Sequence, residues 1–468
     1  MIYGPIRAVA IDDRPTHLLA IGTGLAAVGI PCMSYWYDRD TLKLVPAAKP
    51  HEFLRLVFMD LNLAELGGNP DSKNLAGVVM DVLKQIISPQ GGPYLLIFWT
   101  EVTGKIEEVK QLLYERLEGV PTPLDVVELA KRKFLPNIKA SGKDLDTDLQ
   151  SLFASLTGSL GDLANEVEKL AGARPELSVV SGWESRATEA AARAINEVVH
   201  HARDDVDDKR QVGESMKRVL ATIARAAAGQ VRAESEPARS LDTGMAEILN
   251  DQFSVSVEDA EYSTIVRAAL DADIKAKTKL AKVDRMAAAL NTFFHVDARV
   301  NSAKTTERGV VLPGTSLFTE KLLGGTHLAL FQDDFMLIPK STEEMKKRVA
   351  DLEKQAELLL VEVGADCDHA QAKPRTLRYL VAFQIPQQHI DLVRQKDGKL
   401  RHDALQLLGP WDIGGGAFLL VSCRRFFTWQ DIRPPEGKVK YRLRNSVVNK
   451  LLHHYSTLSS RPGIVEFR

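Results

Sequence analysis

Four short, mainly apolar runs in the first third of the chain each end in a polar residue. The runs span 8–11, 54–59, 94–99 and 126–130, and they end in Asp12, Asp60, Thr100 and Lys131. Runs of this kind are typical of strands buried on both faces, and the helix-like segments that follow them indicate a parallel sheet. With a further strand expected at 32–37, the sequence predicts a doubly wound, five-stranded parallel α/β sheet.

Polar groups at the carboxyl ends of neighbouring parallel strands converge on one crevice at the edge of the sheet. Asp12, Asp13 and Asp60 are therefore expected to lie together, with Thr100 and Lys131 beside them. Three carboxylates repel one another unless a cation lies among them, and Mg²⁺ prefers oxygen ligands. A phosphoryl group on one carboxylate would be stabilised by the metal, the lysine and the hydroxyl. The pattern thus predicts Mg²⁺-dependent phosphoryl chemistry.

Residues 5–140 resemble the receiver domain of response regulators, the aspartate-phosphorylated half of two-component signalling. The resemblance rests on the polar residues just described, which occur in the order of that family and each at a strand end. It implies a flavodoxin-like fold. It also implies a Mg²⁺ site in which Asp12, Asp13 and Asp60 are joined by the backbone carbonyl of Asn62.

The same resemblance implies roles in phosphoryl transfer for three residues. Asp60 would accept a phosphoryl group from a partner histidine kinase. Thr100 would be the switch hydroxyl, and Lys131 would pair with the phosphate, with Lys133 as the alternative lysine. The chain would then be a phosphoacceptor signalling protein with autophosphatase activity as its only enzymatic property.

Three features depart from the family pattern. The segment after Asp60 contains Gly-Gly-Asn-Pro at 67–70, which makes a longer loop than receivers usually have. Arg132 follows the lysine where the family usually has proline, and Leu129 stands where the family has its aromatic switch residue. Phosphate chemistry is therefore expected without the usual aromatic-switch output.

The length of 468 residues suits several domains. We expect a receiver at 1–140, a helical connector at 141–304 and a β-rich module at 305–468. The net charge of −2 argues against nucleic acid as a partner of the whole chain. Three scattered cysteines form no disulfide framework, and the N-terminus has no signal-peptide pattern. No run approaches the roughly 20 apolar residues of a membrane span, so a cytoplasmic location is expected.

The connector is rich in Ala, Leu, Glu and Arg, which favours helices. Helices are expected at 144–170, 183–203, 209–230, 262–270 and 280–294, with a polar linker at 234–243. Their alanine-rich apolar stripes are typical of a bundle or a coiled-coil-like connector. Such stripes also suit a homodimer.

The C-terminal third predicts a small α+β module with a strongly curved or barrel-like sheet. Strands are expected at 310–312, 329–337, 358–363, 376–383, 418–423 and 464–467. Helices are expected at 341–355 and 444–458.

Two further constellations in this module leave several interpretations open. Cys367 and His369 lie in one loop, for which three interpretations stay open. The loop is a turn whose polar side chains find hydrogen-bond partners, or it binds a ligand or partner, or it is a metal or thiol site. The last 48 residues contain ten Lys and Arg against three Asp and Glu, interleaved with aromatic residues. This pattern fits a solvated sheet face or an acidic partner, and a nucleic-acid-binding output is the alternative.

A receiver without a familiar DNA-binding or enzymatic output resembles the receiver-carrying intermediary of two-component-like anti-phage systems such as Detocs. That resemblance implies an effector protein as a further partner and a role in antiviral defence. The alternative of a different class is a degenerate receiver whose acids are structural and which serves as a protein-docking module.

Overall fold

The computed structural model describes residues 7–27, 29–64, 71–100, 104–131, 162–163, 165–167, 169–170, 172–255, 260–275, 283–300, 303–314, 326–337, 342–365, 369, 376–413, 416–430, 435 and 437–459. The chain divides into two compact units, Met1–Glu189 with Val255–Ala272 and Ala190–Ser254 with Asp273–Arg468. The expected boundaries at residues 140 and 304 stay a prediction.

The N-terminal unit is built on a mostly parallel sheet. Its strands are β1 (Ala8–Asp12), β2 (Cys32–Asp38), β3 (Lys43–Val45), β4 (Leu56–Met59), β5 (Leu95–Thr100) and β6 (Asp125–Ala130). The spatial order is β3-β2-β1-β4-β5-β6, and β3 alone is antiparallel to its neighbour. The predicted parallel strands are confirmed, but the sheet has six strands because β3 forms a hairpin with β2.

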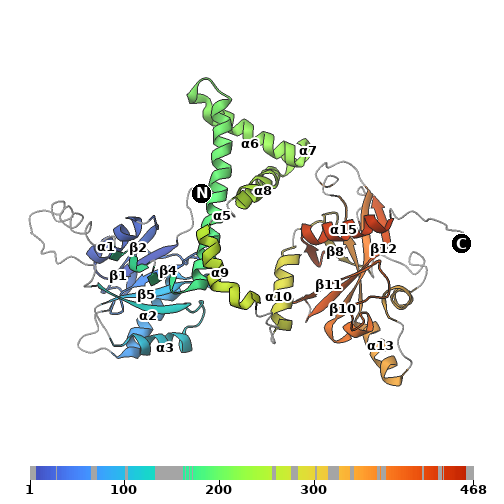
Figure 1. The fold of residues 1–468 in the computed structure, drawn as a ribbon, viewed down its shortest axis with the longest axis horizontal. Helices are drawn as coiled ribbons and strands as arrows, with labels where there is room; N and C mark the ends of the chain where they lie inside the picture. The colour runs from blue at the N-terminus through green and yellow to red at the C-terminus, as the bar shows by residue number, and fades with distance from the viewer. Residues whose placement is uncertain are drawn as a thin grey trace, which may run out of the picture. The chain divides into compact units, whose positions relative to one another are not determined.

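Helices cover both faces of this sheet (Figure 1). On one face, α2 (Ser72–Ile86) and α3 (Ile106–Arg116) bury their apolar stripes against the strands. On the other face, α1 (Pro15–Ala27) packs with Leu18, Ile21 and Leu25. This arrangement confirms the expectation of a doubly wound unit.

The face that α1 covers is completed by residues far along the chain. Leu163, Val167 and Leu177 are buried in the same cluster as the sheet residues Phe58 and Ile97. The helix α5 (Pro175–Asp204) begins in this region. The hydrophobic core of the N-terminal unit therefore extends past residue 140.

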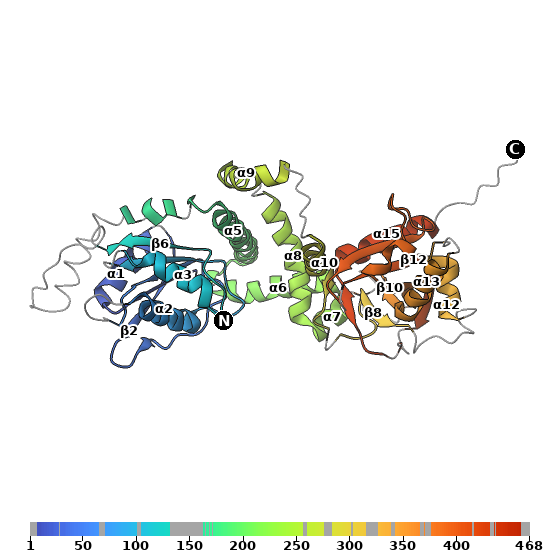
Figure 2. The same cartoon turned by 90° about the horizontal axis from the view of Figure 1, so that it is seen from below.

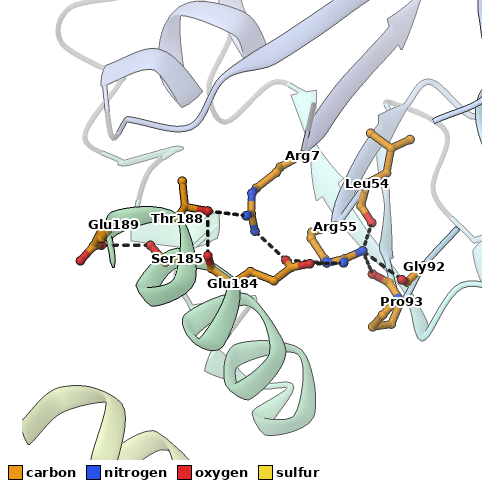
Figure 3. A network of polar contacts seen from close by, with 9 residues as sticks. All are labelled: Arg7, Leu54, Arg55, Gly92, Pro93, Glu184, Ser185, Thr188 and Glu189. Atoms are coloured by element: carbon orange, nitrogen blue, oxygen red, sulfur yellow. Dashed lines mark hydrogen bonds and ion pairs between the residues drawn. The ribbon is translucent and has the colours of Figure 1, made fainter. Parts of the chain in front are cut away.

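Helix α5 is tied to the sheet by a network of charged contacts, which Figure 3 shows. Glu184 accepts from Arg55 Nε at 3.0 Å and pairs with Arg7. Arg55 also donates to the carbonyls of Gly92 at 3.0 Å and Pro93 at 3.3 Å. Because Arg7 and Arg55 directly precede β1 and β4, this network lies at the amino ends of the strands.

The helical part of the chain continues beyond α5. Its elements are η2 (Lys209–Gln211), α6 (Val212–Ala228), α7 (Gln230–Ser235), α8 (Pro237–Val255), α9 (Ala260–Lys275) and α10 (Val283–His295). The helices expected at 183–203, 209–230, 262–270 and 280–294 are confirmed where the residues are described. The linker expected at 234–243 is wrong, because this stretch is helical apart from Glu236. Pro237 opens α8, a position that proline favours since its missing N–H is not needed there.

The C-terminal sheet is antiparallel throughout. Its strands are β7 (Val296–Asp297), β8 (Val310–Pro313), β9 (Glu357–Glu362), β10 (Thr376–Pro386), β11 (Leu405–Trp411), β12 (Ala417–Gln430) and β13 (Tyr441–Leu443). The order is β11-β12-β10-β9-β8-β13-β7. Register shifts after Leu380 and Leu408 help the sheet to curl. Among the described strands β11 and β7 remain edges, so the sheet is curled and not a closed barrel.

Helices flank both faces of the curled sheet (Figure 2). They are α12 (His327–Leu330), η4 (Phe331–Phe335), α13 (Glu343–Gln355), η5 (Gln387–Leu392) and α15 (Asn445–Ser459). The strand expected at 329–337 is wrong, because most of it belongs to α12 and η4. The Thr326 side chain caps this helix by accepting from Ala329 N at 3.1 Å, and Phe331 and Phe335 pack on the sheet four residues apart. The segments 132–136, 141–161 and 464–467 lie outside the described residues.

Candidate functional site

Three carboxylates meet at the carboxyl edge of the N-terminal sheet. Asp12 ends β1, Asp13 follows it, and Asp60 directly follows β4. The Asp60 amide donates to the Ile11 carbonyl at 3.0 Å, which continues the pairing of β1 with β4 to this point. One oxygen from each carboxylate lies within 4.8 Å of the other two, and all three residues are at most 9% exposed. The cluster can therefore bind a metal ion.

Lys131 bridges two of the three carboxylates. It follows β6, and its Nζ is 2.7 Å from Asp12 Oδ2 and 2.7 Å from Asp60 Oδ2. The side chain is 3% exposed. Burying like charges this close together is costly unless an opposite charge is paired with them. The lysine supplies that charge, and the structure places it, directly after β6, against the acids at the ends of β1 and β4.

His17 is a second group that contacts Asp12. Its Nδ1 lies 3.2 Å from Asp12 Oδ1 and 3.2 Å from Lys131 Nζ. Burial by itself raises the pKa of Asp12, but the His17 hydrogen bond and the Lys131 charge outweigh it and hold this pKa below its usual value of 3.8. Asp12 is therefore a carboxylate at neutral pH, which is the form that a cation binds.

Asp13 has its own counter-charge on the β2–β3 hairpin. Arg39, at the start of the hairpin turn, forms an ion pair with the Asp13 carboxylate. Trp36 on β2 donates its indole N–H to the Asp13 carbonyl at 2.8 Å. These residues border an open cavity of about 300 Å³, whose lining is Asp13, Arg14, Trp36, Tyr37, Asp38, Arg39 and Asp40. Of the acidic cluster, Asp13 thus also lines a cavity beside the β2–β3 turn.

The structure places Thr100 and Asn62 at the same edge of the sheet. Thr100 is the last residue of β5, is fully buried, and pairs in register with Ala130, the residue before Lys131. The Asn62 amide donates to Asp60 Oδ1 at 3.3 Å. Their roles as switch hydroxyl and metal ligand stay predictions. The loop 67–70, Arg132 and Lys133 lie outside the described residues, whereas Leu129 is buried on the α1 face.

His17 and Arg39 were not predicted from the sequence. Arg39 directly follows β2, the strand that pairs with β1, but the strand expected at 32–37 ends one residue earlier, so the strand-end rule that selected Asp60 did not reach Arg39. His17 lies five residues after Asp12 in the first turn of α1, and no motif distinguishes it. Only the direction in which α1 leaves the sheet brings its ring to the carboxylate.

The loop with Cys367 and His369 is described only in part. His369 Nε2 lies 3.2 Å from Glu362 Oε1 on β9, and Glu362 is fully buried. Gly364 lies against both groups, since a Cβ there would approach each of them to 2.7 Å. His369 is therefore anchored by a buried carboxylate, and Cys367 lies outside the described residues.

Several cations of the basic C-terminal stretch are paired within their own unit. Lys440 pairs with Glu357 and Arg425 with Asp334. Arg442 pairs with Asp297, and Arg444 donates to the Phe293 carbonyl at 3.1 Å. This pairing lowers the positive charge that the stretch offers to a polyanion.

No protein-family model matches the chain, and no curated protein matches its sequence. Among the described residues, no helix is both long enough and apolar enough to cross a membrane.

Proposed function

We propose that the N-terminal unit is a receiver-like phosphoacceptor in which Asp60 accepts a phosphoryl group with Mg²⁺ bound at Asp12, Asp13 and Asp60. The observation that carries this proposal is the position of Lys131, whose Nζ is 2.7 Å from both Asp12 and Asp60. A lysine that touches the acceptor carboxylate can also reach a phosphoryl oxygen attached to it. The strand order β2-β1-β4-β5-β6 and the resemblance to response regulators support the same assignment.

The donor set fits Mg²⁺, because it offers carboxylate oxygens and no sulfur. Bound there, the ion would offset the charge that develops on the phosphoryl oxygens. Asp60 attacks the phosphorus in line, the bond from phosphorus to the donor breaks, and the donor leaves with the electron pair. Lys131 holds the phosphoryl group by a charge-assisted hydrogen bond, and buried Thr100 lies at the adjacent strand end.

A histidine kinase is the phosphoryl donor that the receiver resemblance implies. The looser resemblance to anti-phage intermediaries adds an effector protein as the recipient of the signal. Both partners belong to this proposal and rest on the acceptor chemistry of Asp60.

The proposal is tested by incubating the full chain with acetyl phosphate and Mg²⁺ and measuring the intact mass. One phosphoryl adduct is expected on the wild type. It should be lost in Asp60→Asn, which keeps the size of the side chain and removes the nucleophile, and in the absence of divalent cations. Asp81→Asn is the matched control, because Asp81 is an exposed acid on α2 and should leave the adduct unchanged.

A second candidate function is a protein-docking module with structural acids. It is favoured by one observation, namely that Lys131 and Arg39 already pair with all three carboxylates. An adduct that survives Asp60→Asn, or no adduct with any donor, would support this candidate over the phosphoacceptor.

A further inference from the structure

The β2–β3 hairpin adds an antiparallel edge strand to the sheet and places one cation against the acidic cluster. The strands pair Trp36 with Val45 and Asp38 with Lys43, so the turn that joins them begins at Arg39. The Asp38 carboxylate holds this turn by accepting from the Asp40 amide at 3.0 Å and from the Thr41 hydroxyl at 2.7 Å. The hairpin therefore presents Arg39 to Asp13 in a defined conformation.

Charge balance at the cluster limits which cations can be present together. Three carboxylates face two permanently charged side chains, Lys131 and Arg39, and these two leave one negative charge over. A divalent ion added to this arrangement would leave one positive charge in excess. Once one protein cation withdraws, the ion and the remaining cation balance the three carboxylates. Metal binding and the withdrawal of one protein cation are thus electrostatically coupled.

The two protein cations differ in how easily they can withdraw. Lys131 is 3% exposed and is held by two carboxylates, with His17 in contact. The Arg39 side chain is 33% exposed and borders the open cavity of about 300 Å³. A long side chain at a hairpin turn can rotate into such a space without disturbing the core. Arg39 is therefore the cation that can leave.

We propose that Arg39 is a resident counter-ion of Asp13 that a divalent metal ion must displace. This inference rests on the metal site of the proposed function and adds a regulatory element to it. Metal loading releases the Arg39 side chain into the cavity and removes the ion pair that ties the β2–β3 turn to Asp13. The attachment of the hairpin thus depends on whether a metal ion is bound at the carboxyl ends of the strands. Arg39 in turn sets the metal affinity of the site.

The test is a calorimetric Mg²⁺ titration of the full chain in four forms: wild type, Arg39→Gln, Arg39→Lys and Lys43→Gln. Arg39→Gln should bind Mg²⁺ about fivefold more tightly, because a partly exposed ion pair no longer competes. Arg39→Lys keeps the charge and should bind nearly as the wild type does. Lys43→Gln deletes a positive charge from an exposed position of the same hairpin. It therefore controls for the loss of a nearby positive charge that is not paired with Asp13.

Hydrogen exchange of residues 36–45 supplies a readout that does not depend on affinity. Mg²⁺ should speed exchange in this segment of the wild type, whereas in Arg39→Gln exchange should be fast already and Mg²⁺ should change it little. Equal or weaker Mg²⁺ binding by Arg39→Gln, or an equal gain in Lys43→Gln, would overturn the role of Arg39. Absence of binding in all four folded proteins would overturn the metal site itself, and the inference with it.

Discussion

Lys131 shows how single residues at the acidic edge depend on one another. Asp12 and Asp60 are buried and share the ammonium group of Lys131. That group therefore stabilises the burial of both carboxylates. Removing one partner from a buried ion pair leaves an uncompensated charge, and this costs far more than the intact pair contributes. The free energy of unfolding should therefore respond strongly to the lysine.

Lys131→Met is expected to lower the free energy of unfolding by about 3 kcal/mol without divalent ions. Mg²⁺ should restore part of this loss, because it supplies the missing charge to the folded state only. Chemical denaturation with and without Mg²⁺ measures both effects. Lys110→Met is the control, since Lys110 pairs with Asp125 at 2.7 Å in a more exposed position and should cost at most about 1 kcal/mol. Equal costs for the two variants would contradict this account of the cluster.

Among the secondary-structure elements, α5 is attached at the amino ends of the strands, whereas the acidic cluster lies at their carboxyl ends. Arg7 and Arg55 precede β1 and β4, and Arg174, just before α5, pairs with Asp125 at the start of β6. The acidic cluster and the anchor of α5 thus lie at opposite ends of the same strands. The anchor can therefore be altered without touching a residue of the acidic cluster.

Glu184→Gln should weaken the attachment of α5 by about 1–3 kcal/mol, since the partly buried Arg55 loses its charged partner. Hydrogen exchange should rise in residues 175–189, and Mg²⁺ affinity should stay at the wild-type value. The control is Glu189→Gln on the same helix, because Glu189 accepts from Ser185 at 3.2 Å on the exposed side. A change in metal affinity with Glu184→Gln would show that the two edges are coupled.

At the scale of the whole molecule, the sheet needs chain from well beyond its last strand. Leu163, Val167 and Leu177 cover the face beside α1, and Tyr262 on α9 packs against Gly182 of α5. The first compact unit accordingly contains Val255–Ala272 as well as the N-terminal 189 residues. A cut at residue 140 would expose the part of the apolar face that Leu163, Val167 and Leu177 cover.

A fragment of residues 1–140 is expected to bind a hydrophobic dye and to unfold without a sharp transition. A fragment of residues 1–189 should unfold cooperatively, because each buried leucine or valine contributes roughly 1.5–3 kcal/mol. Thermal unfolding followed by near-ultraviolet circular dichroism compares the two. Identical, cooperative transitions would show that the shorter segment is a complete domain.

Local sequence patterns were enough to predict the parallel strands and the groups that gather at their carboxyl ends. Asp12, Asp13, Asp60 and Lys131 were identified because strand-length apolar runs are local signals and parallel strands all end at one edge. The contacts of Lys131 with Asp12 and Asp60 agree with that prediction. The metal and the phosphoryl chemistry stay proposals.

Other features depend on contacts that form only when the chain is folded. The stretch at 329–337 has apolar residues on both sides of a Gln-Asp-Asp segment, a pattern that did not separate strand from helix, and packing of Phe331 and Phe335 against the sheet selects the helix. The polar stretch at 234–243 carries no apolar run, yet it forms the end of α7 and the start of α8. His17 and Arg39 reach the acids through the path of α1 and the turn of the hairpin. Contacts between residues distant in sequence depend on chain direction in space, which no local pattern encodes.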